Sequence, residues 1–379
     1  MKRIHLFYFV LTILCTFSCV EKYEYDTTFS LPTALSSPAS VTLDVTSLET
    51  IVLEWSGGGA TDGSIVQYEV LFVAENGNFD NPIQTMPSDL GALPKLTLSH
   101  AQLNAIARRA GITTMQTGVV KWTVTASKAG DVKRAEITKT ISVTRGEGID
   151  NIPETLYLFG SGAAAEGEAR AFRRAEEGVF HIYTNLADGD IHFRNTPNNA
   201  TGFSYFVVNG KLTEGNGNIA VQATVANTPV RIKVDFNALT VTMQTISNVR
   251  CIWGANYDVI GAMTYVSNGI FRADNREIRF IDQSRPETNP PSWLGWIEER
   301  YYFIVAIDGT DHCWGRMDGI SIERPLGNEP VEFYEIGEFA WSQWDHLWKM
   351  NGDLDLKHCD IIIYTNNNGK MFHTFTNIR

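Results

Sequence analysis

The first third of the chain alternates short apolar runs with turn residues. Between residues 39 and 146, runs rich in Val, Ile and Thr follow one another, and Gly57–Gly59 separates two of them. One helix is predicted over residues 100–110, because Ser99 and Gln102 have capping-box spacing and Gly111 follows. Strands are predicted at 41–45, 51–55, 67–74, 119–126 and 137–143. This order indicates an immunoglobulin- or fibronectin-like β-sandwich with Trp55 and Trp122 in its core.

A repeated pattern of strands follows a linker at residues 146–153. Four apolar strings recur in the same order and at similar spacing, which is typical of tandem structural units. The matching segments are 156–160 with 250–254, 178–181 with 269–272, 191–195 with 278–282, and 205–208 with 302–305. We therefore expect β-sandwich modules at 147–247 and 248–379. The fold class predicted for the whole chain is all-β, with tandem β-sandwich domains.

The N-terminus has the pattern of a secretory signal. Two basic residues after Met1 precede an apolar run at residues 4–17, which is too short to span a hydrocarbon core of ~30 Å. Cys19 directly follows this run and a small residue, as in a lipobox, although Phe17 is larger than usual. We predict a signal peptide at 1–18, a lipid on Cys19 and a polar tether at 19–38. Cys15 is a weaker candidate for the lipid, and a plain cleaved signal peptide is the other alternative.

Charge and composition exclude one class of partner. The formal net charge is -12, whereas nucleic-acid binding needs a basic surface that releases counterions. No stretch after the signal reaches 18 apolar residues, so no other membrane span is expected. Three cysteines remain beyond the N-terminus, Cys251, Cys313 and Cys359, and an odd number indicates no closed disulfide framework. They are interpreted as buried thiols, with a Cys313–Cys359 bridge left possible.

Several strings in the first domain occur in a characteristic order. They are Pro38–Leu43, Val52–Ser56, Tyr68–Phe72, Asn78–Pro82, Leu98–Asn104 and Val120–Ser127. As a set, over roughly residues 1–146, they resemble the N-terminal domain of the SusE family, lipoproteins of Bacteroidota outer membranes. The Leu-Tyr-Leu-Phe-Gly string at 156–160 resembles the opening of SusE/SusF-type β-sandwich modules.

The resemblance implies a function. It implies a lipoprotein of the outer membrane, facing outside, whose later modules bind starch or a related glycan beside a TonB-dependent porter and a SusD-like partner. An acidic stretch after the lipid cysteine is a surface-export signal in this group, and Glu21, Glu24 and Asp26 fit it. We expect neither a cofactor nor catalysis, because signatures of both are missing from the sequence.

Tryptophan, the usual stacking platform for sugars, is unevenly distributed. Two of the nine tryptophans lie in the first domain, none lies between residues 147 and 252, and seven lie from residue 253 onward. The binding site is therefore predicted in the last module. Trp293 and Trp296 lie in a proline- and glycine-bearing loop, where a large aromatic side chain is costly to expose unless something covers it. A loop folded back on its own core is the alternative.

Two further segments carry candidate residues. Trp341, Trp344 and Trp348 have i, i+3, i+7 spacing, which predicts one face of a helix, either buried or used as a stacking platform. Trp314 lies beside a turn-rich stretch. Nearby polar residues that could contact hydroxyl groups are Asp311, Arg316, Asp345 and Lys349.

Signatures of other chemistry are missing from the sequence. Neither His312-Cys313 nor His358-Cys359 has metal-ligand spacing, and no metal is expected. No nucleophile elbow, zinc-protease motif or phosphate loop occurs. A glycosidase needs only two carboxylates, which sequence does not exclude, but Glu298-Glu299 is interpreted as a solvated loop. The alternatives to glycan binding are a structural or adhesive lipoprotein and a glycoside hydrolase.

Overall fold

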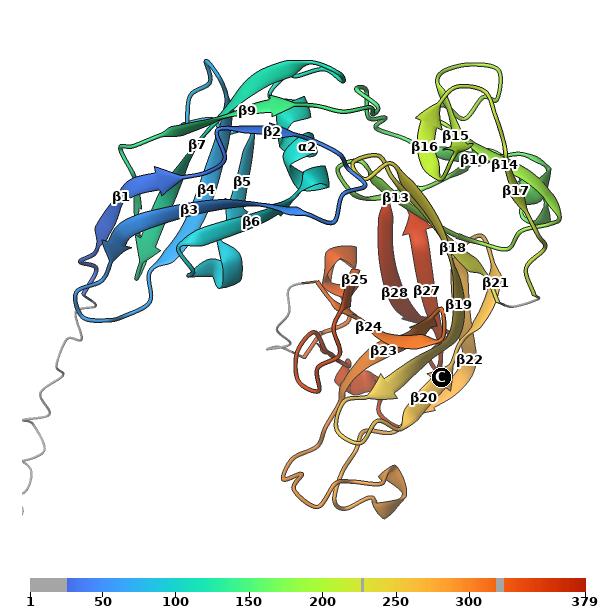
Figure 1. The fold of residues 1–379 in the computed structure, drawn as a ribbon. Helices are drawn as coiled ribbons and strands as arrows, with labels where there is room; N and C mark the ends of the chain where they lie inside the picture. Colours follow the sequence, from blue (N-terminus) through green and yellow to red (C-terminus); the bar gives the residue numbers. More distant parts are fainter. Residues whose placement is uncertain (1–25, 226–227, 318–323) are drawn as a thin grey trace, which may run out of the picture. The chain divides into compact units, whose positions relative to one another are not determined.

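The computed structural model describes residues 26–225, 228–317 and 324–379. It divides into two compact units, Met1–Arg145 and Gly146–Arg379 (Figure 1). Strands make up 49% of the protein and helical turns 8%, which confirms the all-β prediction. The predicted signal peptide, Cys19 and the acidic stretch from Glu21 to Glu24 lie outside the described residues.

The first unit contains two sheets. One has the order β1-β3-β6, and the other β2-β9-β7-β4-β5 with β8 also paired to β7. The strands are β1 (Ser30–Ser36), β2 (Ser40–Thr42), β3 (Thr50–Gly59), β4 (Gln67–Ala74), β5 (Gln84–Pro87), β6 (Lys95–Ser99), β7 (Thr117–Lys128), β8 (Asp131–Arg134) and β9 (Lys139–Thr144). The remaining elements are the short η1 (Asp89–Gly91) and helix α2 (His100–Arg109).

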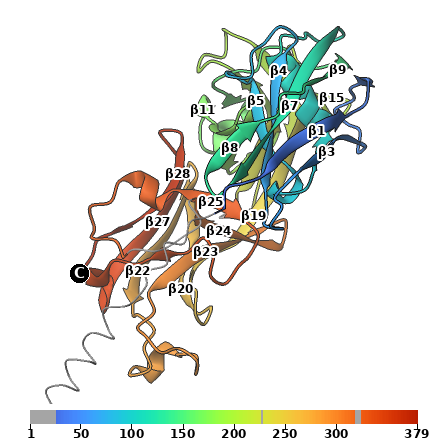
Figure 2. The same ribbon diagram turned by 90° about the vertical axis from the view of Figure 1, so that its left-hand side faces the viewer.

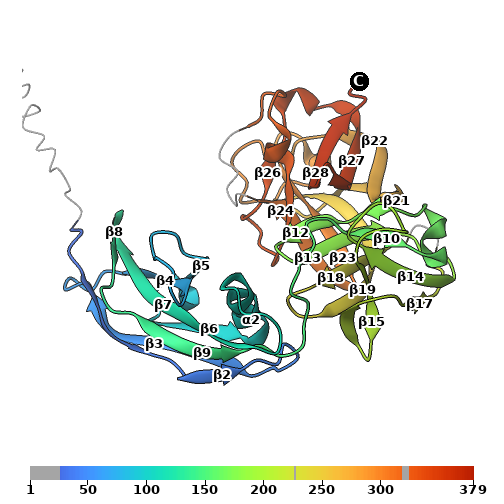
Figure 3. The same cartoon turned by 90° about the horizontal axis from the view of Figure 1, so that it is seen from above.

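Alternating side chains of the two sheets meet in one core. Trp55 on β3 and Trp122 on β7 are both buried there, as predicted. Helix α2 lies beside β6 (Figure 3) and contacts strands of both sheets. Its capping box is present: the Ser99 backbone N–H donates to Gln102 Oε1 at 2.8 Å, and the Gln102 N–H donates to Ser99 Oγ at 3.1 Å. The helix therefore begins where the sequence predicts.

The predicted tether at 19–38 is wrong for its last part. Residues 30–36 form β1, which pairs antiparallel with β3. Phe29 supplies the apolar anchor, because it is buried in the core of this unit. Gly57 allows the close approach of β1: its φ is +75°, and an added Cβ would lie 2.4 Å from Thr33 Oγ1.

The second unit contains three sheets (Figures 1 and 2). Their orders are β11-β10-β14-β15-β16 with β17 on β14; β12-β13-β18-β19-β23-β24-β25 with β20 on β19 and β26 on β23; and β21-β22-β27-β28. The first half has β10 (Tyr157–Phe159), β11 (Arg170–Ala171), β12 (Arg173–Glu176), β13 (Val179–Thr184), β14 (Gly189–Arg194), β15 (Ser204–Val208), β16 (Lys211–Glu214), β17 (Ile219–Val221), β18 (Val230–Asp235) and β19 (Thr240–Trp253). The second has β20 (Val259–Ala262), β21 (Thr264–Ser267), β22 (Ile270–Ile278), β23 (Arg300–Ile307), β24 (Thr310–Arg316), β25 (Ile336–Phe339), β26 (Trp348–Lys349), β27 (Lys357–Asn367) and β28 (Lys370–Thr376). Short helical turns are η2 (Ser161–Ala165), η3 (Pro286–Thr288), η4 (Val331–Tyr334) and η5 (Gly352–Leu354).

The long strand β19 runs through both halves of this unit. Its first part pairs with β18 and its last part with β20 and β23, so the predicted boundary between residues 247 and 248 lies inside it. A buried polar contact also joins the halves. The Glu166 carboxylate pairs with Arg170 at 2.7 Å and accepts a hydrogen bond from the Tyr265 hydroxyl at 2.9 Å. The sheet around β19 and β23 carries the loops described next.

Candidate functional site

Three loops of the second unit contact one another at the ends of β19, β22, β23 and β25. The first is 254–258, the second 279–299 and the third 340–347. The second loop extends beyond the strand ends in two views, drawn in orange (Figures 1 and 2). Asn256 Nδ2 donates to the carbonyl oxygens of Thr288 and Asn289 at 3.0 and 3.1 Å, which joins the first loop to the second.

Aromatic rings make further contacts within and between these loops. Trp293 lies edge-on to Trp344 with ring centroids 5.5 Å apart, and Trp296 lies 6.1 Å from Trp293. Tyr257 and Trp341 lie 5.8 Å apart. These five residues, Tyr257, Trp293, Trp296, Trp341 and Trp344, are called the aromatic surface below.

The aromatic surface is open to solvent. Each of its side chains is between 42% and 55% exposed. Singly exposed aromatic residues are common, but here the rings lie in two contacting groups, Trp293 with Trp296 and Trp344, and Tyr257 with Trp341. Exposed apolar groups that lie together favour an interaction site. The structure thus brings together four of the five tryptophans proposed from the sequence.

Buried residues form hydrogen bonds with two of the exposed indoles. Trp341 Nε1 donates to the hydroxyl of Tyr302, a fully buried residue of β23, at 2.8 Å. Trp296 Nε1 donates to Glu298 Oε2 at 2.8 Å. The Arg300 guanidinium lies 5.3 Å from the ring centre of Trp344. Because these polar atoms already have partners, the exposed ring faces are preorganised for apolar contacts.

The interpretation of Glu298-Glu299 as a solvated loop is wrong. Glu298 is 1% exposed, and both its oxygens accept from Arg300 at 2.7 Å. Glu299 is also buried and pairs with Arg324 at 3.0 Å. Burial of a carboxylate requires a cation and hydrogen bonds, and each of these glutamates has both. Glu298 therefore acts as a support for Trp296 and Arg300.

A small cavity adjoins Trp341. Its volume is about 320 Å³, and it is lined by Arg250, Ile252, Tyr257, Ile304, Asp311 and Trp341. Arg250 Nη2 lies 2.6 Å from Asp311 Oδ2, so the cavity wall carries an ion pair beside two aromatic rings. Asp311 was proposed from sequence, whereas Arg250 and Tyr257 were not. Arg250 comes close to Asp311 because β19 pairs with β23 and β23 with β24, which residue spacing does not reveal.

Two predictions for the remaining tryptophans are wrong. Trp314 is 1% exposed and packs edge-on against Tyr183 and Phe271, so it cannot stack on a sugar. Residues 341–347 form no helix; Trp348 begins β26 and is buried, with its Nε1 donating to the Phe333 carbonyl at 2.7 Å. The third loop turns instead around Ser342, whose hydroxyl donates to Asp345 at 2.7 Å.

Lys349 lies next to the aromatic surface through its backbone. It pairs with Arg300 across β26 and β23, and Arg300 lies over Trp344. Its side chain is half-buried. A contact between this ammonium group and a ligand stays a prediction.

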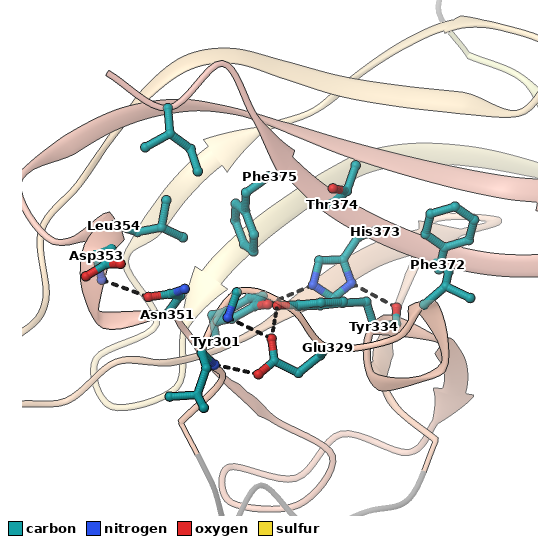
Figure 4. A pocket seen from close by; sticks show the side chains of 14 residues that line it. Tyr301, Glu329, Tyr334, Asn351, Asp353, Leu354, Phe372, His373, Thr374 and Phe375 are labelled. Atoms are coloured by element: carbon teal, nitrogen blue, oxygen red, sulfur yellow. Dashed lines mark hydrogen bonds between the residues drawn. The ribbon is translucent and has the colours of Figure 1, made fainter.

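Another cavity of the second unit, about 550 Å³ in volume, lies around His373 (Figure 4). His373 is fully buried; Tyr301 donates its hydroxyl to Nε2 at 2.7 Å, and Nδ1 contacts the Tyr334 carbonyl at 3.1 Å. Burial lowers the pKa of His373 to about 3, so the ring is neutral. Glu329 accepts the N–H groups of Leu326 and Gly327 at 2.5 and 2.9 Å. Since both ring nitrogens and this carboxylate have partners, these groups build the cavity wall.

The described residues contain no group of three or more His, Cys, Asp or Glu side chains that could hold a metal ion. In the same part of the chain, no helix has the length and apolarity needed to cross a membrane. Cys251, Cys313 and Cys359 are all free and buried, so the possible Cys313–Cys359 bridge is not formed. Burial raises the pKa of Cys313 to about 12 and that of Cys359 to about 11.

The comparison with known families concerns the N-terminal part. Residues 21–125 match the SusE outer membrane protein family. This confirms the resemblance drawn from the strings of the first domain. The matched SusE segment lies in the first unit, whereas the whole aromatic surface lies in the second.

Comparisons with solved structures and with curated proteins give no further information about function. The chain is similar to SusF from Bacteroides thetaiotaomicron, at 12% identity and a TM-score of 0.27, with 90% of this chain and 100% of that chain covered. A TM-score of 0.27 does not establish a shared fold. No curated protein matches the sequence. The SusE match therefore supports an outer-membrane protein, and the second unit has to be interpreted from its own residues.

Proposed function

We propose that the protein is a non-catalytic surface lipoprotein that binds starch or a related polysaccharide and assists its uptake by a SusC/SusD-type system. The aromatic surface carries this proposal. Its five half-exposed rings come from three loops and form two contacting groups, Trp293 with Trp296 and Trp344, and Tyr257 with Trp341. The indole N–H groups of Trp296 and Trp341 are bound to the protein itself. A soluble protein presents such a group when a partner covers it.

The chemistry of this surface suits sugar rings. One face of a pyranose presents C–H groups that pack on a flat indole, while its hydroxyl groups need charged or polar partners. The partly exposed Arg250–Asp311 pair beside Trp341 offers such partners. Burial of apolar surface contributes roughly 25 cal/mol per Å², so a single indole face gives only modest binding. Several rings together are therefore needed for useful affinity.

A neutral polysaccharide is favoured over a charged one at this surface. Arg250 is balanced by Asp311, and Arg300 by Glu298. A net charge of -12 on the chain also opposes the approach of a polyanion. Starch meets both conditions because it carries no charge. Trp314 is excluded from this site by its burial, whereas Lys349 stays a candidate hydroxyl contact.

The place of action follows from the SusE match and the lipobox. We infer that Cys19 carries the lipid, that the anchor lies in the outer membrane, and that the protein faces outside beside SusC/SusD-like proteins. A polysaccharide offers many equivalent sites to a tethered binder. Weak single contacts are multiplied in this way, since the effective local concentration is high.

Affinity electrophoresis in gels containing starch tests the proposal. The protein should be retarded, and retardation should fall at least tenfold in Trp293→Ala/Trp344→Ala and in Trp341→Ala, which corresponds to about 1.4 kcal/mol. Phe203→Ala is the matched control, because Phe203 is 47% exposed but is not part of the aromatic surface. Retardation by starch that survives in the tryptophan variants would contradict the assigned site. Release of reducing ends during incubation would favour a glycoside hydrolase instead.

A further inference from the structure

A second cavity of about 350 Å³ lies elsewhere in the second unit, between β12, β13, β18 and β25. It shares no lining residue with the aromatic surface or with the cavity beside Trp341. Its volume lies at the lower end of the range for small-molecule sites, ~300–1,000 Å³. We call it the basic cavity, because Arg173, Arg231 and Lys233 line it together with His181.

The sheet register places these basic groups on one face. Arg173 lies directly opposite His181 on the neighbouring strand, and His181 lies directly opposite Lys233 on the next. Arg231 lies two residues before Lys233, opposite Tyr183, and so faces the same side. Like charges in adjacent positions of a sheet cost stability unless something compensates them.

The structure compensates only part of this charge. Arg231 is 7% exposed and is paired with Glu338 at 2.5 Å. Lys233 has Asp235 at 3.9 Å, which is the outer limit of an ion pair. Glu176 also lines the cavity but, within the described ranges, pairs with neither Arg173 nor Lys233.

Two buried nitrogen atoms at this cavity have no hydrogen-bond partner. They are Arg173 Nε and His181 Nε2. Buried polar atoms are nearly always bonded, so two such atoms beside one cavity indicate a ligand that accepts from both. Burial, and to a smaller extent the charges of Arg173, Arg231 and Lys233, lower the pKa of His181 to about 3, so its ring is neutral.

We propose that the basic cavity binds a small oxyanion, such as the carboxylate or sulfate group of a ligand about as large as a monosaccharide. The Arg173 guanidinium offers a planar pair of donors that matches an oxyanion, and the Lys233 ammonium group offers a point charge. His181 Nε2 completes the set as a third hydrogen-bonding group. This site is independent of the neutral polysaccharide proposed for the aromatic surface.

Titration of the full protein with three probes tests the proposal: inorganic sulfate, glucuronate and glucose. Isothermal calorimetry measures the affinity, and the ¹³C-labelled imidazole resonance of His181 reports the place of binding. Glucuronate should bind and shift the His181 signal, and glucose should do neither. Binding of glucuronate tighter than sulfate assigns the site to a sugar acid, and equal or tighter binding of sulfate assigns it to a free inorganic anion; both support an oxyanion site.

Charge-neutral variants test the residues. Arg173→Gln and Lys233→Gln should each weaken binding at least tenfold. Arg174→Gln is the matched control, because Arg174 is the next residue on β12, points to the opposite face and pairs with Glu154. Trp293→Ala should leave anion affinity unchanged, which separates this site from the aromatic surface. The proposal is overturned if neither anion shifts the His181 signal, or if Arg174→Gln weakens binding as much as Arg173→Gln.

Discussion

Trp344 lies edge-on to Trp293, with a ring separation of 5.5 Å and an angle of 78° between the ring planes. The two residues belong to different loops, so each indole fixes the position of the other. The Arg300 guanidinium near Trp344 adds a third contact from β23. Each of these two exposed indoles is therefore positioned partly by the other.

Coupling between these two indoles is the first prediction. Trp293→Ala and Trp344→Ala should each weaken starch binding, because removal of one ring also releases the other. The double variant should then cost about 0.5–1.5 kcal/mol less than the sum of the single variants. Affinity electrophoresis of the four proteins gives this difference directly. Additive losses would show that the rings bind without depending on each other.

The second prediction concerns the support beneath the surface. Glu298→Gln keeps the size of the side chain but removes the charge that Arg300 and Trp296 use. Since Arg300 stays partly exposed, water offsets part of the loss, and we expect destabilisation of about 1–3 kcal/mol and weaker starch binding. Denaturant unfolding followed by tryptophan fluorescence measures the first effect.

Glu287→Gln in the same loop is the matched control. Glu287 is exposed and contacts Arg279 at 3.3 Å, so its loss should change stability by no more than about 0.5 kcal/mol. If both substitutions had the same small effect, Glu298 would be no support for the surface.

The local patterns of the sequence predict much of the fold and part of the site. The strand predicted at residues 67–74 has the same bounds as β4, and the Ser99 capping box marks the start of α2. The loop with Trp293 and Trp296 is likewise predicted from its prolines and from the cost of exposing indoles. These features depend on residues close together in the chain.

What the sequence does not reveal depends on pairing between distant strands. Trp314 and Trp341 have the same side chain, but one is buried by Tyr183 and Phe271 and the other is held at the surface by Tyr302. The helical spacing of Trp341, Trp344 and Trp348 is misleading, because a turn around Ser342 replaces the helix. Burial of Glu298 follows from Arg300 folding back onto it.

The third prediction tests whether the contact between Gly315 and His346 positions the third loop. Gly315 on β24 lies against His346, and an added Cβ would lie 2.7 Å from the His346 carbonyl oxygen. That oxygen also accepts the N–H of Arg316 at 2.7 Å, so it cannot move without breaking a backbone hydrogen bond. Gly315→Ala should cost about 1–3 kcal/mol in stability and weaken starch binding by displacing Trp341 and Trp344.

Gly309→Ala on the preceding turn is the control, because it introduces backbone strain without a steric clash. Its φ is +79°, but nothing lies within 4 Å of the added Cβ. We expect lower stability and unchanged starch binding, because the third loop is not touched. Fluorescence of the exposed indoles should shift to longer wavelength in Gly315→Ala alone. An unchanged spectrum and unchanged starch binding in Gly315→Ala would contradict the role of Gly315 in positioning the third loop.

The last prediction is a pH dependence of stability that originates at His373. Its pKa is about 3 in the folded protein, whereas an unfolded histidine has a pKa near 6.5. Between pH 6.5 and pH 3, His373 is therefore protonated in the unfolded chain but stays neutral in the folded protein. The contribution of His373 is fully present above pH 6.5 and is lost as the pH falls toward 3, by up to about 1.4 kcal/mol per pH unit.

His373→Gln separates this effect from the carboxylates that titrate in the same range. Glutamine can accept from Tyr301 and donate to the Tyr334 carbonyl but cannot ionise, so the variant should be less stable at pH 7 yet lose less stability between pH 6 and pH 4. Urea unfolding of both proteins at several pH values measures the two slopes. His181 has a similarly low pKa and is present in both proteins, so its contribution cancels in the difference. Parallel slopes would mean that His373 is protonated in the folded protein, and the hydrogen bond from the Tyr301 hydroxyl to Nε2 would then have to reverse its direction.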